Sequence, residues 1–239
     1  MFNPKYTISN KLLENIKKIT KLISDLNNRN FSNVVLAELE KRALEISSYS
    51  STSIEGNPLP LTDVKRILKN KPEYIRDSEK EVLNYNKALI DLNSLIKSNK
   101  IIFNKALILK IQKTITNELI EDYRCGKIRQ EPVFVNNPKT RQIVYLPPDH
   151  INVNSLLDEL FSYLDKNKNI IDPLILAGIF HKQFVIIHPF VDGNKRTGYT
   201  VARIFLLQNG NDVTATEQEK YDFIVGIASG DIKFEEILY

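Results

Sequence analysis

The sequence predicts an all-α fold, a helical bundle with one β-hairpin inserted into it. Apolar residues recur at helical spacing along most of the 239 residues, and this is the main sequence signal for amphipathic helices. Two short runs, 131–135 and 142–146, have β-type composition, and the turn-forming residues Asn-Asn-Pro-Lys-Thr separate them, as in a hairpin. Neither an internal repeat nor a low-complexity linker divides the chain, so we expect a single domain over residues 1–239.

The expected helices have recognisable ends. The helix over 33–53 should stop before Gly56 and Pro58, since glycine and proline terminate helices. Thr62 is expected to cap a short helix, and Ser78 a longer one with Glu81 in the capping-box position. The expected helices cover residues 9–26, 33–53, 62–68, 78–95, 104–119, 153–165, 173–187, 194–208 and 216–228, with a short one near 234.

Composition and charge exclude several protein classes. Hydrophobic residues make up 42% of the chain and the net charge is +4, with Lys and Arg spread along the sequence, so no basic tract or DNA-binding domain is evident. A single cysteine, Cys125, excludes internal disulfides and cysteine-rich zinc sites. No segment approaches the roughly 20 apolar residues of a membrane span, and the N-terminus does not resemble a signal peptide. We therefore expect a cytoplasmic protein.

The segment HPFVDGNKRTG at 188–198 differs from the rest of the chain. Pro189 disfavours helix at the residue before it, so the helix that begins at 173 should end at His188. Asp192 and Gly193 have turn chemistry, after which helical spacing resumes. We expect a helix–loop–helix in which His188 enters the loop and the second helix begins close to Gly193.

This loop has the residue types that phosphate chemistry needs. A helix N-terminus offers free backbone N–H groups to an anion, and Gly193 lets the backbone approach it closely. Lys195 and Arg196 add positive charge, and Arg196 can bind two phosphate oxygens. Asp192 offers an oxygen to Mg²⁺, and His188 can serve as a general base. Each residue also has a structural explanation as a loop residue, turn former or cap, but their joint occurrence indicates a site.

The stretch HPFVDGNKR at 188–196 resembles the signature of the Fic family, histidine-x-phenylalanine-x-acid-glycine-asparagine-x-arginine. SSTSIEGN at 50–57 is similar to the N-terminal inhibitory motif of that family, and the hairpin ending in VYLPP at 144–148 is similar to its target-docking flap. EVLNYNKAL at 81–89 and AGIFHKQFVIIHPF at 177–190 are similar to helices of the same family. The resemblance thus covers most of the chain.

The resemblance implies a Fic-type helical bundle and a protein adenylyltransferase, a nucleotidyltransferase that moves AMP from ATP onto a hydroxyl side chain of a target protein. It implies ATP and Mg²⁺ (or Mn²⁺) as cofactors, and a protein substrate that the sequence does not identify. It also implies an inhibitory helical region at 1–60 and a Fic core at about 100–239. Because Fic relatives often dimerise, a homodimer is one expected assembly.

The same resemblance assigns roles to individual residues. His188 would deprotonate the target hydroxyl, and Glu55 would block productive ATP binding. The other implied residues are Asp192 for the metal; Gly193, Asn194, Lys195 and Arg196 for the ATP phosphates; Ser51 and Gly56 for the inhibitory motif; and Ile143, Val144 and Tyr145 for the flap, which would hold the target by strand addition.

Two departures from the family pattern leave alternatives open. Adenylyl-transferring members usually have glycine where this chain has Lys195, and a second arginine where it has Tyr199. The lysine is similar to the Doc branch, toxins that phosphorylate their target, so a Doc-like kinase is the alternative. Two further functions stay open. The chain could remove the modification, with Glu55 positioning a water, or it could be a degenerate Fic domain that only binds a partner. Without the second arginine, Glu55 needs another cation or is only a helix-end residue. The candidate cations are Arg196, which we favour, Lys195 and Arg203.

Overall fold

The structure is a computed structural model that describes residues 2–98, 100–136 and 142–209. Eight helices and one two-stranded antiparallel sheet lie in this part of the chain, and the predicted all-α bundle with an inserted hairpin is confirmed. The elements are α1 (Asn10–Asn27), α2 (Asn33–Ser53), α3 (Leu61–Lys69), α4 (Asp77–Lys97), α5 (Lys105–Thr116), β1 (Val135–Asn136), β2 (Ile143–Tyr145), α6 (His150–Asn167), α7 (Pro173–Ile187) and α8 (Asn194–Gln208).

Three predicted helices, over 33–53, 173–187 and 194–208, have the expected bounds, but two predicted caps are wrong. α3 begins at Leu61 behind Pro60, so Thr62 lies inside the helix. α4 begins at Asp77, and the backbone N–H of Arg76 donates to Glu79 Oε2 at 2.9 Å. Glu79, not Glu81, therefore closes this helix end. The helices expected over 216–228 and near 234 lie outside the described residues.

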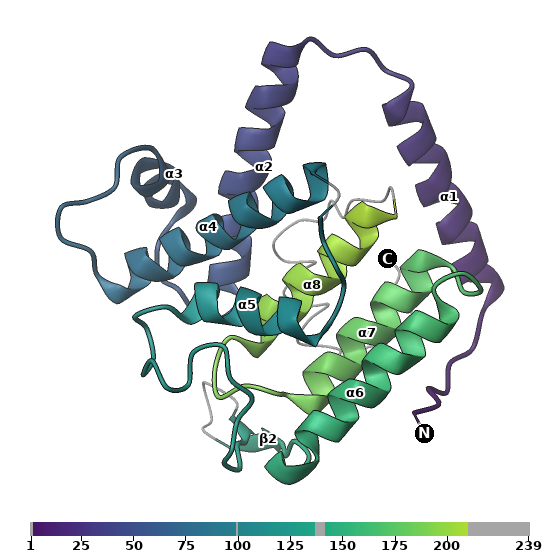
Figure 1. The fold of residues 1–239 in the computed structure, drawn as a ribbon. Coiled ribbons are helices and arrows are strands. Elements are labelled where there is room, and N and C mark those ends of the chain that lie inside the picture. Colours follow the sequence, from purple (N-terminus) through teal and green to yellow (C-terminus); the bar gives the residue numbers. More distant parts are fainter. Residues whose placement is uncertain (1, 99, 137–141, 210–239) are drawn as a thin grey trace.

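The arrangement in space places α8 at the centre (Figure 1). α7 packs along one side of α8, while α4 and α5 pack against its other sides. α6 lies beside α7, and α2 lies against α4. The hairpin lies at the lower end of the molecule in Figure 1, next to the start of α6. The loop between α7 and α8 therefore joins the two most closely packed helices.

The core is built from the buried faces of α4 to α8 and from an aromatic cluster. The Phe180 and Phe184 rings of α7 stack at 5.5 Å, and Phe190 of the following loop lies 6.2 Å from Phe184. Phe103 packs edge-on against Phe205 of α8 at 5.1 Å. Because Phe190 is completely buried, the loop that carries the signature is anchored in the core on both sides of His188.

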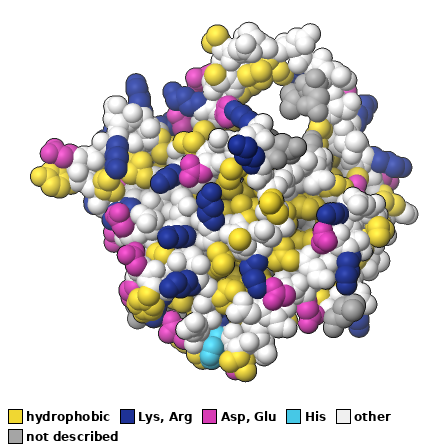
Figure 2. Space-filling model, viewed as in Figure 1, with side chains coloured by type: hydrophobic (Ala, Val, Ile, Leu, Met, Phe, Trp, Pro, Cys, Tyr) yellow, Lys and Arg dark blue, Asp and Glu magenta, His cyan; other side chains and the backbone are white. Residues whose placement is uncertain are grey.

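The surface agrees with the mild net charge. Lys and Arg side chains alternate with Asp and Glu over the face in Figure 2, and no large patch of one sign forms there. None of the helices in the described part of the chain has the length and apolar character that crossing a bilayer requires.

Candidate active site

The α7–α8 loop is held in one conformation by its own side chains. His188 ends α7 in the left-handed region, with φ 50° and ψ 62°. The amide of Asn194 bridges the loop: its Oδ1 accepts from the Phe190 N–H at 2.9 Å, and its Nδ2 donates to the Phe190 carbonyl at 2.8 Å. Gly193, with φ 77°, makes the turn into α8. The side chain of Asn194 thus shapes the loop.

Gln112 of α5 fixes the loop from the side. Its Nε2 donates to the Asp192 carbonyl at 3.2 Å, and its Oε1 accepts from the Gly126 N–H at 2.5 Å. The positive φ of Gly193 favours glycine there, and a Cβ would also make a tight contact, 3.1 Å, with the Thr116 side chain. The loop, α5 and the segment before the hairpin therefore form one packed unit.

A cleft of about 350 Å³ opens over this loop. It lies between the N-terminus of α8, the end of α2 and β1. The lining residues are Glu55, Glu81, Phe134, Val135, Asn136, His188, Val191, Asp192, Gly193, Asn194, Lys195 and Arg196. The structure thus brings together the histidine, the acid, the cations and the glutamate that the sequence pointed to.

His188 is half-buried at the edge of the cleft. Burial lowers the pKa of its imidazole to about 4, with a hydrogen bond to the Val185 backbone acting in the opposite direction. The positive charges of Arg129 and Lys195 lower this pKa further, whereas Asp192 raises it. At pH 7 the imidazole is therefore neutral and able to accept a proton, which a general base requires.

Three carboxylates surround Arg196 at the start of α8. Its Nε is paired with Glu55 Oε2, its Nη1 lies 2.6 Å from Glu81 Oε1, and its Nη2 lies 3.7 Å from Asp192 Oδ2. Burial lowers the pKa of the guanidinium, but these carboxylates raise it above its ordinary value. Arg196 is therefore a permanent cation whose charge is balanced by nearby carboxylates.

Glu55 takes the place of an anion at the N-terminus of α8. Its Oε1 accepts a hydrogen bond from the Arg196 backbone N–H at 3.4 Å, while its other oxygen pairs with the guanidinium. Free N–H groups in the first turn of a helix are the positions that bind phosphates. Burial raises the pKa of Glu55, and Arg196 offsets part of this effect. Of the three cations considered as its partner, the structure places Arg196 against Glu55.

Hydrogen bonds tie the end of α2 to the body of the molecule. Ser51 Oγ donates to Tyr85 Oη of α4 at 2.8 Å, and Tyr85 Oη in turn lies 2.9 Å from Thr200 Oγ1 of α8. Gly56, at φ 94°, turns the chain away after Glu55. The three hydroxyls fix the end of α2 relative to α8 and so place the backbone of Glu55 beside the start of α8.

Asn57 links the same region to Glu81. Its Nδ2 donates to Glu81 Oε2 at 2.6 Å and to the Ser78 carbonyl at 2.8 Å, while its Oδ1 accepts from the Leu59 N–H. Glu81 is thus held between Asn57 and Arg196. Sequence reasoning missed this role of Glu81, since it placed that residue in a capping box.

Asp192 is the residue that could hold a metal ion. Its Oδ1 accepts from the Gly193 N–H at 2.6 Å, and its side chain is about half exposed in the cleft. Within residues 2–98, 100–136 and 142–209, no three His, Cys, Asp or Glu side chains gather as a metal cluster. Mg²⁺ often binds through one or two carboxylates together with substrate phosphates, so a single acid beside a phosphate site fits that ion.

The hairpin borders the cleft on the side of His188. β1 and β2 pair antiparallel, with Val135 opposite Tyr145, and each strand has one edge outside this pair. Ile143 and Val144 of β2 are exposed, whereas Tyr145 is half-buried and donates from Oη to the Ile186 carbonyl at 2.8 Å. The strands are shorter than the predicted runs, and the turn between them lies outside the described residues.

Comparison with known proteins agrees with this geometry. The Fic/DOC family model matches residues 102–206, from before α5 through most of α8. The chain carries a Fic/DOC domain. The expected resemblance is thereby confirmed over these residues, and the matched segment contains the hairpin, His188 and residues 192–196.

Relatives extend the similarity beyond the Fic domain. The chain is 26% identical over 211 residues to a protein adenylyltransferase Fic of Aedes aegypti, covering 84% of this chain and 40% of the relative. A protein of the same name from Nematostella vectensis is 27% identical over 187 residues, covering 73% of this chain and 40% of the relative. This chain therefore spans about two fifths of the length of these curated relatives.

Solved structures have the same fold. Fic-1 of C. elegans (aa134–508) superposes with a TM-score of 0.79 at 21% identity, covering 95% of this chain and 67% of that one. A Fic domain containing signaling protein from Bacteroides thetaiotaomicron gives a TM-score of 0.76 at 18% identity, covering 94% and 88%. The Fic fold thus extends over nearly the whole chain, including α1 to α4 outside the matched domain.

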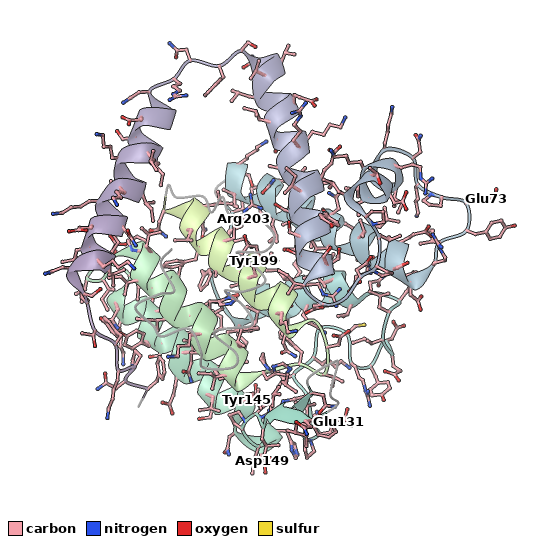
Figure 3. All side chains as sticks on the ribbon, turned by 180° about the vertical axis from the view of Figure 1, so that it is seen from behind. Glu73, Glu131, Tyr145, Asp149, Tyr199 and Arg203 are labelled. Atoms are coloured by element: carbon pink, nitrogen blue, oxygen red, sulfur yellow. The ribbon has the colours of Figure 1, made fainter. Side chains whose placement is uncertain are left out.

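Tyr199 occupies the position where the sequence departs from the family. It lies on α8 (Figure 3) and is buried against Ile54, the residue before Glu55. The ring therefore packs the end of α2 onto α8. In the part of the chain that the structure describes, Glu55 pairs with the guanidinium of Arg196.

Proposed function

We propose that this chain transfers AMP from ATP onto a hydroxyl side chain of a target protein. The supporting observation is the juxtaposition, in one cleft, of a neutral half-buried histidine, a half-exposed carboxylate and a cationic helix N-terminus. These groups match a base, a metal ligand and a phosphate site. The names of the relatives add support, although the chain spans only part of them.

In the proposed reaction, the target hydroxyl oxygen attacks the α-phosphorus of ATP and its proton passes to His188. The new bond joins oxygen to the α-phosphorus, and the bond to the oxygen that bridges the α- and β-phosphates breaks. Pyrophosphate leaves with that electron pair. The backbone N–H groups of the first turn of α8, with Lys195 and Arg196, would stabilise the phosphate charge.

Asp192 would hold Mg²⁺ (or Mn²⁺), which when bound neutralises phosphate charge and orients the leaving group. The exposed Ile143 and Val144 of the hairpin would capture a target strand, because an open strand edge can pair with an extended peptide. The division into an inhibitory region at 1–60 and a core from about 100, the homodimer and the cytoplasmic location stay predictions.

The resting arrangement supports autoinhibition through Glu55. Its carboxylate occupies the N–H group and guanidinium that we assign to phosphate. ATP must displace this carboxylate before its phosphates bind Arg196. We therefore propose that Glu55, positioned by Ser51 and Gly56, keeps the enzyme in a low-activity state.

Lys195 favours a second candidate, transfer of the γ-phosphate. Its side chain lines the cleft at the position where a glycine would leave space for the α-phosphate. A lysine there could bind the phosphate chain in the reverse direction and present the γ-phosphorus to the hydroxyl. The product would then be a phosphoprotein and ADP.

The deciding experiment supplies ATP labelled at the α- or γ-phosphate, with a cell lysate as acceptor. It compares the wild type with Glu55→Gly and Glu55→Gly/His188→Ala. Label from the α position alone supports adenylylation, and label from the γ position alone supports the kinase. If Glu55→Gly transfers neither label, both candidates are wrong. His150→Ala is the matched control, because His150 lies outside the cleft lining.

A further inference from the structure

Arg129 is a buried arginine between α5 and the hairpin, and only 3% of it is exposed. The four hydrogen bonds that the described residues give its side chain all end on backbone carbonyls. Nε donates to His188 O at 2.8 Å and Nη1 to Glu131 O at 3.1 Å. Nη2 donates to Pro148 O at 2.5 Å and to Ile187 O at 3.5 Å. This guanidinium therefore joins three separate backbone segments.

A buried charge usually needs a compensating partner. Here the compensation comes from the C-terminal end of α7, where carbonyl groups without helical partners carry partial negative charge. Burial lowers the pKa of Arg129, while the more distant Asp149 raises it, and an arginine remains charged in either case. Arg129 thus acts as a cationic cap on the helix that ends at His188.

Four consecutive carbonyls at this helix end are bound by Arg129, which precedes the hairpin, and by Tyr145 of β2. Tyr145 Oη donates to Ile186 O at 2.8 Å, the Arg129 side chain donates to Ile187 O and His188 O, and the Arg129 backbone N–H donates to Pro189 O at 3.0 Å. Figure 3 shows Tyr145 together with Glu131 and Asp149 at the end of the molecule that carries the hairpin. The two sides of the hairpin and the histidine backbone thus share one hydrogen-bonded junction.

The backbone of His188 needs such support. A non-glycine residue at positive φ costs roughly 1–3 kcal/mol and persists when its surroundings hold it in place. With φ 50°, His188 is one of two such residues in the described chain. The hydrogen bond from Arg129 Nε to the His188 carbonyl fixes the peptide that follows this strained residue.

We propose that Arg129 is a positioning residue: through the His188 carbonyl it holds the imidazole toward the cleft, and through the Glu131 and Pro148 carbonyls it couples the histidine to the hairpin. This inference rests on the proposed function, in which His188 is the base and the hairpin holds the target. Movement of the hairpin on target binding would be transmitted to His188 through the Arg129 guanidinium.

The test replaces Arg129 in the Glu55→Gly background, where transfer is expected to be fast enough to measure. Arg129→Gln should lower the apparent kcat for label transfer from ATP to lysate protein by about 100-fold, the loss expected from a displacement on the order of 1 Å. The KM for ATP should change less than about twofold, because ATP contacts the start of α8. Arg129→Lys should lose as much, since one ammonium cannot bridge three segments.

The matched control is Arg124→Gln, which removes a partly exposed arginine from the same segment. It should keep the kcat of the Glu55→Gly parent. Arg129→Lys with the parental kcat, or Arg129→Gln with an unchanged kcat, would overturn the proposal. If Arg129→Gln fails to fold by circular dichroism, Tyr145→Phe takes its place: it removes only the bond to Ile186, and an unchanged kcat in that variant would also count against the junction.

A measurement without substrate separates this inference from the proposed function. The chain has three histidines, His150, His181 and His188, so NMR can follow the titration of His188 by itself. The charges around it are Arg129, Lys195 and Asp192, with Glu55, Glu81 and Arg196 lining the same cleft. Arg129→Gln should move the imidazole pKa upward, toward 6.5, and change the ring resonances. An unaltered His188 spectrum overturns the positioning role even if transfer is never detected, whereas an altered spectrum without transfer in any variant counts against the proposed function alone.

Discussion

Glu55 and Arg196 form an ion pair that the protein keeps from solvent: the guanidinium is 3% exposed and the carboxylate 13%. The second oxygen of Glu55 also accepts from the Arg196 backbone N–H, at 3.4 Å. One side chain thus satisfies both kinds of group that a helix N-terminus offers to a phosphate. Any anion entering the cleft must compete with a carboxylate that is already part of the chain.

Glu55→Gly should therefore raise ATP affinity or the transfer rate. A hydrogen bond to a charged group contributes roughly 1.5–3 kcal/mol, which corresponds to about tenfold to a hundredfold or slightly more in affinity. Glu55 follows the end of α2, so glycine there costs little helix stability. Calorimetry of ATP binding and label transfer give the two readouts. Glu73→Gly, in an exposed loop at the outer edge (Figure 3), is the control and should match wild type; equal affinities in all three proteins would exclude inhibition by Glu55.

Glu81 and Glu55 should be coupled through Arg196. Each single Gln substitution leaves the guanidinium one close carboxylate, whereas the double variant leaves only Asp192, at 3.7 Å. Stranding a buried charge costs about 3–5 kcal/mol, so the double variant should be less stable than the sum of the single effects by roughly 0.5–3 kcal/mol. Urea unfolding of the four proteins measures this. The exposed Lys105–Asp158 pair is the control, since Asp158→Asn should cost less than about 1 kcal/mol; strict additivity at Arg196 would show that the pairs act independently.

The helices were predictable because each has its own periodic apolar pattern and its own residues that begin or end a helix. Asn104 and Pro173 stand at the beginnings of α5 and α7, and Pro189 follows the end of α7, so local signals sufficed there. The beginning of α4 was misjudged because Ser78 and Arg76 compete for the same helix end, and the interaction of Arg76 with Glu79 prevails. The strands were predicted too long because the pairing of β1 with β2 has an irregularity next to Val135.

The site was predictable where its residues are close in sequence and not where they are distant. His188, Asp192 and Arg196 lie within the short stretch 188–196, so their spacing alone indicated a shared cleft. Glu81 lies 115 residues before Arg196 and reaches it only because α4 packs against α8. Arg129 had no sequence signal as a partner of His188, since its contacts are to backbone carbonyls, which any sequence provides.

The pH dependence of transfer should lack a step near the ordinary histidine pKa. Burial lowers the pKa of His188 to about 4, and a base acts in its neutral form, which predominates above the pKa and is lost as the pH falls through it. In the Glu55→Gly variant, kcat should stay nearly constant from pH 7.5 to about 5.5, as this lowered value implies. Buffered assays with α-labelled ATP test this. An acid limb centred near 6.5 would indicate an exposed imidazole or another base.

Acid should also weaken inhibition by Glu55. Burial raises the pKa of its carboxyl, with Asp192 and Glu81 adding to the rise while Arg196 and Lys195 oppose it. As the pH falls through this raised pKa, the carboxyl becomes neutral and its attraction to Arg196 declines. The ratio of the Glu55→Gly rate to the wild-type rate should therefore be largest at neutral pH and decrease in acid. Glu55→Gln, which cannot titrate, should keep a constant ratio to Glu55→Gly across the same range, and a wild-type ratio that rises in acid would contradict the assignment.

Tyr85→Phe tests whether the position of Glu55 depends on the hydroxyls behind it. The substitution removes one hydroxyl that both Ser51 and Thr200 use, at 2.8 and 2.9 Å, in a fully buried place. Leaving buried polar groups unsatisfied costs roughly 1–3 kcal/mol, so the free energy of unfolding in urea should fall by about that amount. Tyr74→Phe, on an exposed tyrosine, should leave it unchanged.

The regulatory part of this prediction separates packing from inhibition. If the Ser51–Tyr85–Thr200 chain holds the end of α2 on α8, Tyr85→Phe should raise label transfer in the wild type, by less than Glu55→Gly does, because the carboxylate is loosened rather than removed. In the Glu55→Gly background the same substitution should add nothing, since no carboxylate remains to be positioned. A rate increase of equal size in both backgrounds would mean that Tyr85 affects the cleft directly, and a loss of stability without any change in rate would mean that Glu55 keeps its place through Ile54 and Tyr199 instead.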